Sequence, residues 1–313
     1  MKNIQLPYLD DFLLNLKVNN LSNETIYNYE RDLKVFQGFL GDIGTEFDET
    51  DKKTILNYKA YLVSRDRKTS ENHAGKKTLG SFSVNRMLSA LRSYLKYVID
   101  MDYKCPISPS EIKLVKNEKK HPRVLGFDEI IKLIESPTLF EKNKIISIRN
   151  RAILETLFST GMRVSEIVNM KKEEIDKQGR IFIKGKGKKE RFVYLTPRAV
   201  KWIKQYSEIR DTESPYLFVP YRGRNMNLKE KKISTNYLED KVKKYRELLG
   251  FNVPVNVHGI RHAFATYLAE NGANPAAIQI LLGHESLDTT TRYVNASDKY
   301  AERIHRQFHP LKE

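Results

Sequence analysis

The chain has 313 residues, enough to bury a sizeable core and to form two domains. It carries 55 Lys and Arg against 39 Asp and Glu, a formal net charge of +16, which favours a polyanionic partner, nucleic acid before membrane. The single cysteine, Cys105, excludes an internal disulfide and a cysteine-based metal cluster, and no apolar run approaches the ~18 residues of a membrane span.

The N-terminal part of the chain is predicted to form a four-helix domain. Apolar residues recur there at helical spacing, and Ser22 and Asp51 are residue types that start helices. Gly41 would end the second helix. The four predicted helices cover residues 8–16 and 26–40, a stretch from about 51, and residues 83–98.

A polar, basic loop is predicted at residues 65–79, between the third and fourth helices. Lys76 and Lys77 at its end could continue into a basic ridge with Arg86 and Arg92 on the fourth helix. Such a ridge would contact DNA phosphates, which position a protein without reading sequence. A solvated helix face explains the same charges, so both interpretations stay open.

A charged, proline-bracketed stretch at residues 116–123 is predicted to be a linker. It separates an N-terminal domain, residues 1–115, from a second domain, residues 124–313. Residues 1–120 hold 20 Lys and Arg against 16 Asp and Glu, while residues 121–313 hold 35 against 23. The second domain therefore carries most of the net positive charge.

The second domain is predicted to be helical with one small antiparallel sheet. Two short β-prone runs, 180–184 and 191–195, flank a Gly-rich basic tip and indicate a β-hairpin. Gly161 is in a helix-ending position. One helix is predicted to start at about residue 127. The other predicted helices cover 148–159, 164–170, 197–208, 233–249, 257–271, 275–282, 287–294 and 298–307.

Tyr293 is a candidate nucleophile. A free phenol has a pKa near 10 and attacks poorly at neutral pH, so it needs cationic or hydrogen-bonding neighbours. His258 and Arg261, three residues apart in a predicted helix, would share a face, and His262 would be more buried. His284 follows a helix end. Each of these residues, taken alone, has an ordinary structural explanation.

Two further cations come from upstream. Arg163 follows the turn at Gly161, and Glu166, three residues on, could hold it. Lys186 lies at the Gly-flanked hairpin tip and could reach outward. A surface ion pair and a solvated turn explain them equally well in isolation, but the ordered set is a stronger signal than its members.

The ordered set resembles the tyrosine recombinases, or phage integrase family, and its sequence motifs are most similar to those of the Xer-type members. The resemblance covers most of the chain. The motifs that carry it are Thr-Gly-Met-Arg-Val-Ser-Glu-Ile, Gly-Lys-Gly-Lys-Lys-Glu-Arg, Gly-Ile-Arg-His-Ala-Phe-Ala-Thr and Leu-Leu-Gly-His-Glu-Ser-Leu-Asp-Thr-Thr. The departures are mild: Ile260 stands where leucine is common, and the loop at 65–79 is longer than usual.

The resemblance implies a core-binding (SAM-like) N-terminal domain and a catalytic second domain whose six catalytic positions are all filled. These positions are Arg163, Lys186, His258, Arg261, His284 and Tyr293. It also implies cleavage of DNA through a 3′-phosphotyrosine, with Lys186 as the general acid.

The chemistry is coherent from the residues alone. Arg163 and Arg261 would clamp the non-bridging oxygens of a phosphodiester, and the histidines would add hydrogen bonds. Glu166 would orient Arg163. We expect no metal and no other cofactor, because the phosphotyrosine conserves the energy of the broken bond.

The expected partner is double-stranded DNA, bound by dimers at each site that assemble into a homotetramer and exchange strands through a Holliday junction. The resemblance implies that the tail, residues 298–313, docks on a neighbouring subunit; a helix packed in cis is the alternative. A second recombinase or a DNA translocase is a possible partner. The N-terminus lacks the apolar run of a signal peptide, so we expect a cytoplasmic, nucleoid-associated prokaryotic protein without a membrane partner.

Three alternatives stay open. The first is an integrase of a phage or mobile element in place of an Xer-like enzyme that resolves chromosome or plasmid multimers. The second is a type IB topoisomerase, which uses similar chemistry on one strand at a time. The third is a DNA-binding regulator without catalysis, against which the complete set of six residues argues.

Overall fold

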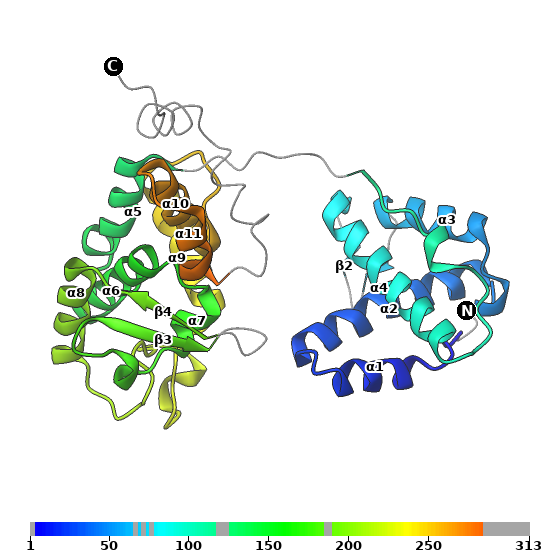
Figure 1. The fold of residues 1–313 in the computed structure, drawn as a ribbon, viewed down its shortest axis with the longest axis horizontal. Helices are drawn as coiled ribbons and strands as arrows, with labels where there is room; N and C mark the ends of the chain where they lie inside the picture. Colours follow the sequence, from blue (N-terminus) through cyan, green and yellow to red (C-terminus); the bar gives the residue numbers. More distant parts are fainter. Residues whose placement is uncertain are drawn as a thin grey trace, which may run out of the picture. The chain divides into compact units, whose positions relative to one another are not determined.

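The computed structural model describes residues 4–64, 68–69, 73–74, 78–116, 125–184 and 190–283. The chain divides into two compact units, Met1–His121 and Pro122–Glu313 (Figure 1). Each unit has its own buried apolar core. The predicted mainly helical fold with a small antiparallel sheet is confirmed.

The described part of the first unit contains four α-helices, as predicted. The caps explain where two of them begin: the Ser22 hydroxyl accepts from the backbone N–H of Thr25 at 3.2 Å, and the Asp51 carboxylate from that of Thr54 at 2.7 Å. The helices and short 3₁₀ turns are α1 (Leu9–Val18), α2 (Asn23–Ile43), η1 (Phe47–Glu49), α3 (Lys52–Val63), α4 (Ser81–Asp100) and η2 (Pro109–Glu111).

Two local predictions in this unit are wrong. Helix α2 continues through Gly41 and ends at Ile43, where Gly44, with a φ of 69°, gives the left-handed cap that closes a helix. The predicted loop contains a short antiparallel ladder between β1 (Lys68–Thr69) and β2 (His73–Ala74). A two-residue strand is too short to show the alternation by which strands are recognised in a sequence.

The second unit packs its helices around α6 (Lys144–Thr160), which is buried along most of its length. Helices α5, α8 and α10 pack against it (Figure 1). The helices and turns are α5 (Phe127–Phe140), α6, α7 (Val164–Asn169), η3 (Lys172–Glu174), α8 (Pro197–Ile209), η5 (Arg224–Asn227), α9 (Thr235–Leu248), α10 (Val257–Glu270) and α11 (Pro275–Leu282).

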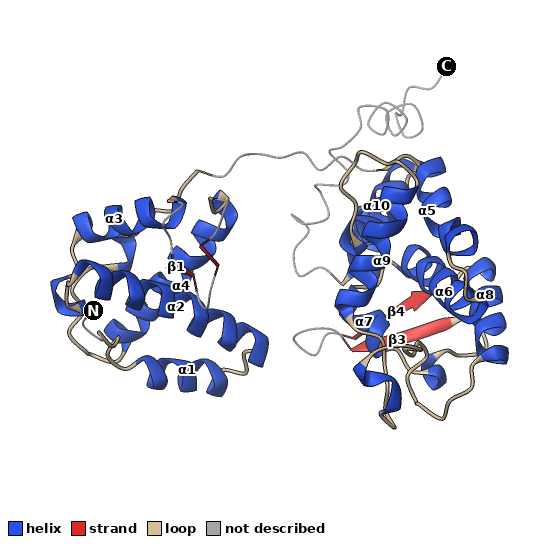
Figure 2. Cartoon of the chain, turned by 180° about the vertical axis from the view of Figure 1, so that it is seen from behind, coloured by secondary structure: helices blue, strands red, loops and turns tan. Residues whose placement is uncertain are grey.

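The predicted hairpin is present as β3 (Arg180–Lys184) paired antiparallel with β4 (Glu190–Tyr194), shown as arrows among the helices in Figure 2. Helix α6 begins at Lys144, earlier than predicted, because the Asn143 side chain accepts from two backbone N–H groups at 3.1 Å. The predicted helices at 287–294 and 298–307 lie outside the described residues. Of the helices described, none is long and apolar enough to cross a membrane.

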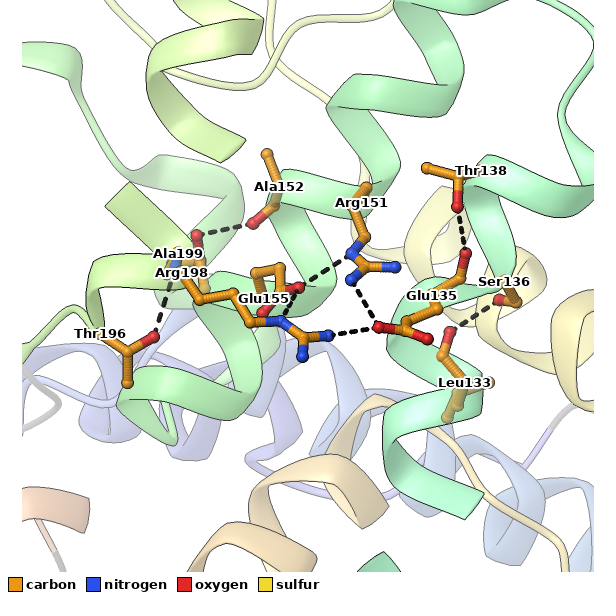
Figure 3. Close-up of polar contacts among 11 residues, drawn as sticks. Leu133, Glu135, Ser136, Thr138, Arg151, Ala152, Glu155, Thr196, Arg198 and Ala199 are labelled. Carbon is orange, nitrogen blue, oxygen red and sulfur yellow. Dashed lines mark hydrogen bonds and ion pairs between the residues drawn. The ribbon is translucent and has the colours of Figure 1, made fainter. Parts of the chain in front are cut away.

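An ion-pair cluster fixes α5, α6 and α8 to one another (Figure 3). The Arg151 guanidinium donates from Nε to Glu155 at 2.8 Å and from Nη2 to Glu135 at 3.1 Å. Arg198 on α8 donates to the same two carboxylates, at 2.6 Å and 3.0 Å. The Arg151 guanidinium also lies 5.0 Å from the ring centroid of Trp202.

We expect Glu155→Ala to destabilise the second unit by about 3–5 kcal/mol, because it leaves the buried guanidinium of Arg151 without its buried carboxylate. Glu135→Ala is the matched control. It removes a carboxylate that is 44 % exposed from the same cluster, and should cost about 1 kcal/mol or less. Urea unfolding followed by the fluorescence of Trp202, the only tryptophan, measures both; equal losses would contradict the prediction.

Candidate active site

The position of Arg163 is set by the end of α6. Gly161 closes that helix with a φ of 62°, and a Cβ there would lie 2.4 Å from the Phe264 ring on α10. Only glycine fits both the backbone conformation and the close approach. The chain then turns, and Arg163 becomes the residue that precedes α7, with 38 % of its side chain exposed.

Glu166 holds Arg163 in place, as predicted from their spacing. Its carboxylate accepts from the Arg163 backbone N–H at 2.7 Å and from Arg163 Nη1 at 3.1 Å. Burial opposes ionisation of Glu166, but hydrogen bonds from Arg191 and Arg163 outweigh it and hold the pKa of this carboxyl below its ordinary value. Glu166 is therefore a carboxylate at neutral pH.

Arg191, on β4, is a site residue that the sequence reasoning missed. It donates from Nη1 and Nη2 to the two oxygens of Glu166, at 2.9 Å and 2.7 Å, and its side chain is only 5 % exposed. The signal was available: in the alternating pattern of β4, Arg191 falls on the inward face with Val193. An arginine that points inward needs a buried partner.

Arg261 lies on α10 and is 2 % exposed. It donates from Nη1 to the carbonyl of Gly161 and from Nη2 to that of Leu282, both at 2.6 Å. Its guanidinium thus bridges the end of α6 to the end of α11. The carbonyls at a helix C-terminus lack intrahelical partners and carry partial negative charge, so they suit a buried guanidinium.

Arg163 reaches the same place. Its Nη2 donates to the carbonyl of Gly283 at 3.0 Å, next in the chain to the carbonyl that receives Arg261. Two guanidinium groups from residues about a hundred positions apart therefore meet at the end of α11. Gly283, with a φ of 63°, closes that helix directly before His284.

His258 is exposed, and the positive charges of Arg261 and Arg163 act on its imidazole. Partial desolvation, followed by the positive charges of Arg261 and Arg163, lowers the pKa of its imidazole below the ordinary value. In the free protein His258 is therefore neutral at neutral pH, so it has one nitrogen that can accept a proton.

The prediction that His262 is more buried than Arg261 is wrong. His262 is half-buried, with its Nδ1 3.4 Å from the Thr266 hydroxyl, while Arg261 points into the core. Burial also lowers the pKa of His262. The burial order reverses because helix-end carbonyls satisfy the arginine from two sides.

Several candidate residues lie outside the described part of the chain. These are Lys76, Lys77, Lys186, His284 and Tyr293. Their predicted roles stay predictions.

Of the two described residues in the predicted basic ridge, Arg86 has a buried partner and Arg92 is exposed. The Arg86 guanidinium donates to Asp32 at 2.5 Å, and Asp32 is 2 % exposed. The outer part of Arg86 remains accessible, with 43 % of its side chain exposed. Across the described ranges no group of three or more His, Cys, Asp and Glu is placed to hold a metal ion.

Comparison with known proteins gives two family matches. Residues 123–300 match the model of the phage integrase family, and residues 9–101 match that of the N-terminal SAM-like domain of phage integrases. Together the two matches take in most of both compact units.

Curated relatives match along nearly the whole chain. A protein named tyrosine recombinase XerD, from Staphylococcus epidermidis, is 32% identical over 298 residues, which cover 93% of this chain and 94% of that protein. The protein of the same name from Staphylococcus aureus is 30% identical over 313 residues, covering 96% and 98%.

Solved structures share the fold. The crystal structure of XerA recombinase is 26% identical, with a TM-score of 0.51, covering 97% of this chain and 98% of that one. A post-cleavage complex of the XerH site-specific recombinase with its difH substrate has a TM-score of 0.72 at 20% identity, covering 97% and 89%.

The lowered pKa values of His258 and His262 predict a pH dependence of stability. Between the ordinary histidine value of about 6.5 and the lower folded-state values, the unfolded chain binds more protons than the folded one. The free energy of unfolding should therefore fall as the pH is lowered through 6.5. Urea unfolding, followed by Trp202 fluorescence at a series of pH values, measures it.

His258→Asn with His262→Asn should flatten this slope just below the ordinary histidine value of about 6.5. Glu166 does not contribute there, because its pKa lies below the ordinary value of 4.5 and its contribution is lost only at lower pH. An unchanged slope in the double variant would contradict the assignment.

Proposed function

Because the chain belongs to the phage integrase family and is a tyrosine site-specific recombinase of the Xer type, we propose that it cleaves duplex DNA with Tyr293 as the nucleophile. The observation that supports this proposal is the meeting of Arg163 and Arg261 on the adjacent carbonyls of Gly283 and Leu282. The six proposed catalytic residues are Arg163, Lys186, His258, Arg261, His284 and Tyr293.

The two arginines suit a phosphodiester whose charge increases during reaction. Attack on phosphorus builds negative charge on the non-bridging oxygens, and preorganised guanidinium groups stabilise that charge better than they stabilise the ground state. Both guanidinium groups donate to neutral carbonyls, which do not cancel their positive charge, and Arg163 also pairs with the Glu166 carboxylate. Arg163 is also accessible enough to meet a substrate.

In the proposed step the phenolic oxygen of Tyr293 attacks the phosphorus, and the bond from phosphorus to the 5′ oxygen breaks. The phenol loses its proton to His258 or His284, and Lys186 donates a proton to the leaving 5′ oxygen. The product is a 3′-phosphotyrosine and a free 5′-hydroxyl. The reverse attack by a 5′-hydroxyl of another strand rejoins the DNA, and two such exchanges pass through a Holliday junction.

The first unit is proposed to hold the DNA through its basic residues. Arg92 on α4 is exposed, and Arg86 keeps its outer part accessible although Asp32 pairs with it. With Lys76 and Lys77 these residues would contact phosphates. In this proposal residues 1–115 form the core-binding domain, 116–123 the linker and 124–313 the catalytic domain.

The assembly that we propose is a homotetramer, with a dimer on each DNA site, and the proposed substrate is a chromosome or plasmid multimer. The curated relatives carry the name XerD and come from bacteria, which supports this choice over an integrase of a phage or mobile element. A second recombinase or a DNA translocase would be its partner, and the bacterial cytoplasm its location.

Tyr293→Phe should abolish the covalent protein–DNA complex while DNA binding is retained, because phenylalanine lacks the attacking oxygen. A nicked duplex that carries a candidate site traps the complex, which denaturing electrophoresis detects, and a mobility-shift assay measures binding.

Tyr267→Phe is the matched control. Tyr267 packs against Phe127 and Phe158, at centroid distances of 5.0 Å and 6.2 Å, and burial raises the pKa of its phenol, so it is badly suited to attack. An unchanged complex in Tyr293→Phe would overturn the assignment. DNA binding by the wild type without any covalent complex would favour the non-catalytic regulator.

A chain truncated after Asp298 tests the proposed role of the tail in the tetramer. It should still form dimers on one site, but synapsis of two sites should be impaired, because the apolar residues of the tail would no longer reach a neighbouring subunit. Analytical ultracentrifugation on one-site and two-site DNA measures the assembly. Full tetramers with normal strand exchange would show that the tail packs in cis.

A further inference from the structure

Arg191 joins three parts of the second unit at one guanidinium. It lies on β4, immediately after the hairpin segment that carries Lys186 in the sequence, and it contacts Glu166 on α7 and the end of α11. We propose that Arg191 is a positioning residue, which holds Arg163 and the end of α11 in the geometry that cleavage requires. This inference rests on the proposed function of Arg163.

The first support is the saturation of the Glu166 carboxylate. Oε1 accepts from Arg191 Nη1 at 2.9 Å and from Arg163 Nη1 at 3.1 Å. Oε2 accepts from Arg191 Nη2 and from the Arg163 backbone N–H, both at 2.7 Å. A carboxylate has about four lone-pair sites, and all four are used here. These four hydrogen bonds fix the orientation of the Glu166 carboxylate, and the fixed carboxylate in turn orients the Arg163 side chain.

The second support is charge balance. A lone carboxylate beside Arg163 would neutralise the guanidinium that is needed for the phosphate. Arg191 supplies a second positive charge to Glu166, so the three groups together carry a net charge of +1. Arg191 thus lets Glu166 orient Arg163 without cancelling its field.

The third support is the contact with α11. Arg191 Nε donates to the carbonyl of Leu281 at 2.9 Å. A Cβ on Gly283 would lie 3.1 Å from Arg191 Cδ and 3.2 Å from Nη1, so the side chain packs directly against the glycine backbone. The same guanidinium that fixes Glu166 therefore fixes the turn from which His284 continues.

A purely structural role is the competing explanation. Buried arginine–carboxylate pairs are weak indicators of stabilisation, because desolvation of the two charges offsets much of their attraction. The two roles differ in what a change in substrate charge should do. Stability does not depend on the charge of the scissile phosphate, whereas the action of Arg163 does.

The experiment compares Arg191→Gln with the wild type on two trapped DNA substrates, one with a normal scissile phosphate and one with a methylphosphonate. The methylphosphonate has a methyl group in place of one non-bridging oxygen and carries no negative charge. On the normal phosphate we expect covalent-complex formation to slow on the order of 10²-fold, with DNA affinity unchanged. On the methylphosphonate most of that deficit should disappear, because the arginine clamp is no longer needed for charge.

Arg180→Gln is the matched control. Arg180 lies on β3 of the same hairpin and pairs with Asp176 at 2.6 Å, but its side chain is 46 % exposed and its ion-pair partner is outside the site. It should leave the cleavage rate unchanged on both substrates.

A third substrate tests the hairpin lysine. A sulfur in place of the bridging 5′ oxygen makes a leaving group that needs no general acid. It should rescue Lys186→Ala but not Arg191→Gln. Rescue of Arg191→Gln by the sulfur would overturn the inference, because Arg191 would then act through the hairpin lysine.

Two further variants keep the test valid if Arg191→Gln does not fold. Arg191→Lys retains the charge but loses the bidentate geometry, so it should be slow with a normal melting temperature. The double variant Arg191→Gln, Glu166→Gln removes both buried charges and should recover part of the rate that Arg191→Gln loses, because no lone carboxylate neutralises Arg163.

Equal deficits of a folded Arg191 variant on phosphate and methylphosphonate would overturn the inference, and so would a wild-type rate. Absence of a covalent complex in the wild type itself would instead overturn the proposed function. The two failures are therefore distinguishable.

Discussion

The contact between arginine side chains and helix-end carbonyls is the interaction on which the site depends. Helices α6 and α11 both close on left-handed glycines, Gly161 and Gly283, and their terminal carbonyls receive Arg261 and Arg163. Neutral acceptors satisfy the donors without cancelling the charge. The ion-pair cluster around Arg151 does the opposite, because its carboxylates neutralise the arginines. One unit thus uses arginine both for cohesion and for a positive field.

Much of the fold followed from local chemistry. The caps at Ser22 and Asp51 and the alternation in the hairpin are short-range sequence signals, and the structure contains the helix starts and the strand pair that they predict. One prediction failed because two glycines lie close together near the end of the same helix. Helix α2 runs through Gly41 because a glycine costs only about 1 kcal/mol in a helix interior, while Gly44 offers the left-handed cap.

The candidate site was predicted as a list of residues, and the structure adds how three of them come together. Spacing placed His258 and Arg261 on one helix, but it could not show that Arg261 turns inward toward carbonyls of two other helix ends. It also gave no role to Arg191: the alternation of β4 places this arginine on the inward face, but it does not identify the partners on α7 and α11. Convergence across about a hundred residues is a tertiary property that no local pattern contains.

In the proposed mechanism the same arginines link substrate binding to proton transfer. In the free protein the charges of Arg261 and Arg163, added to desolvation, keep the pKa of His258 low and its imidazole neutral. In the proposed mechanism a phosphodiester between the arginines offsets those charges, so the pKa of His258 rises when DNA is bound. The imidazole then accepts a proton more readily while the phosphate is present. In this mechanism His258 is the strongest base when Tyr293 has a phosphorus to attack. When no DNA is bound, His258 is a weaker base, so the phenol of Tyr293 keeps its proton.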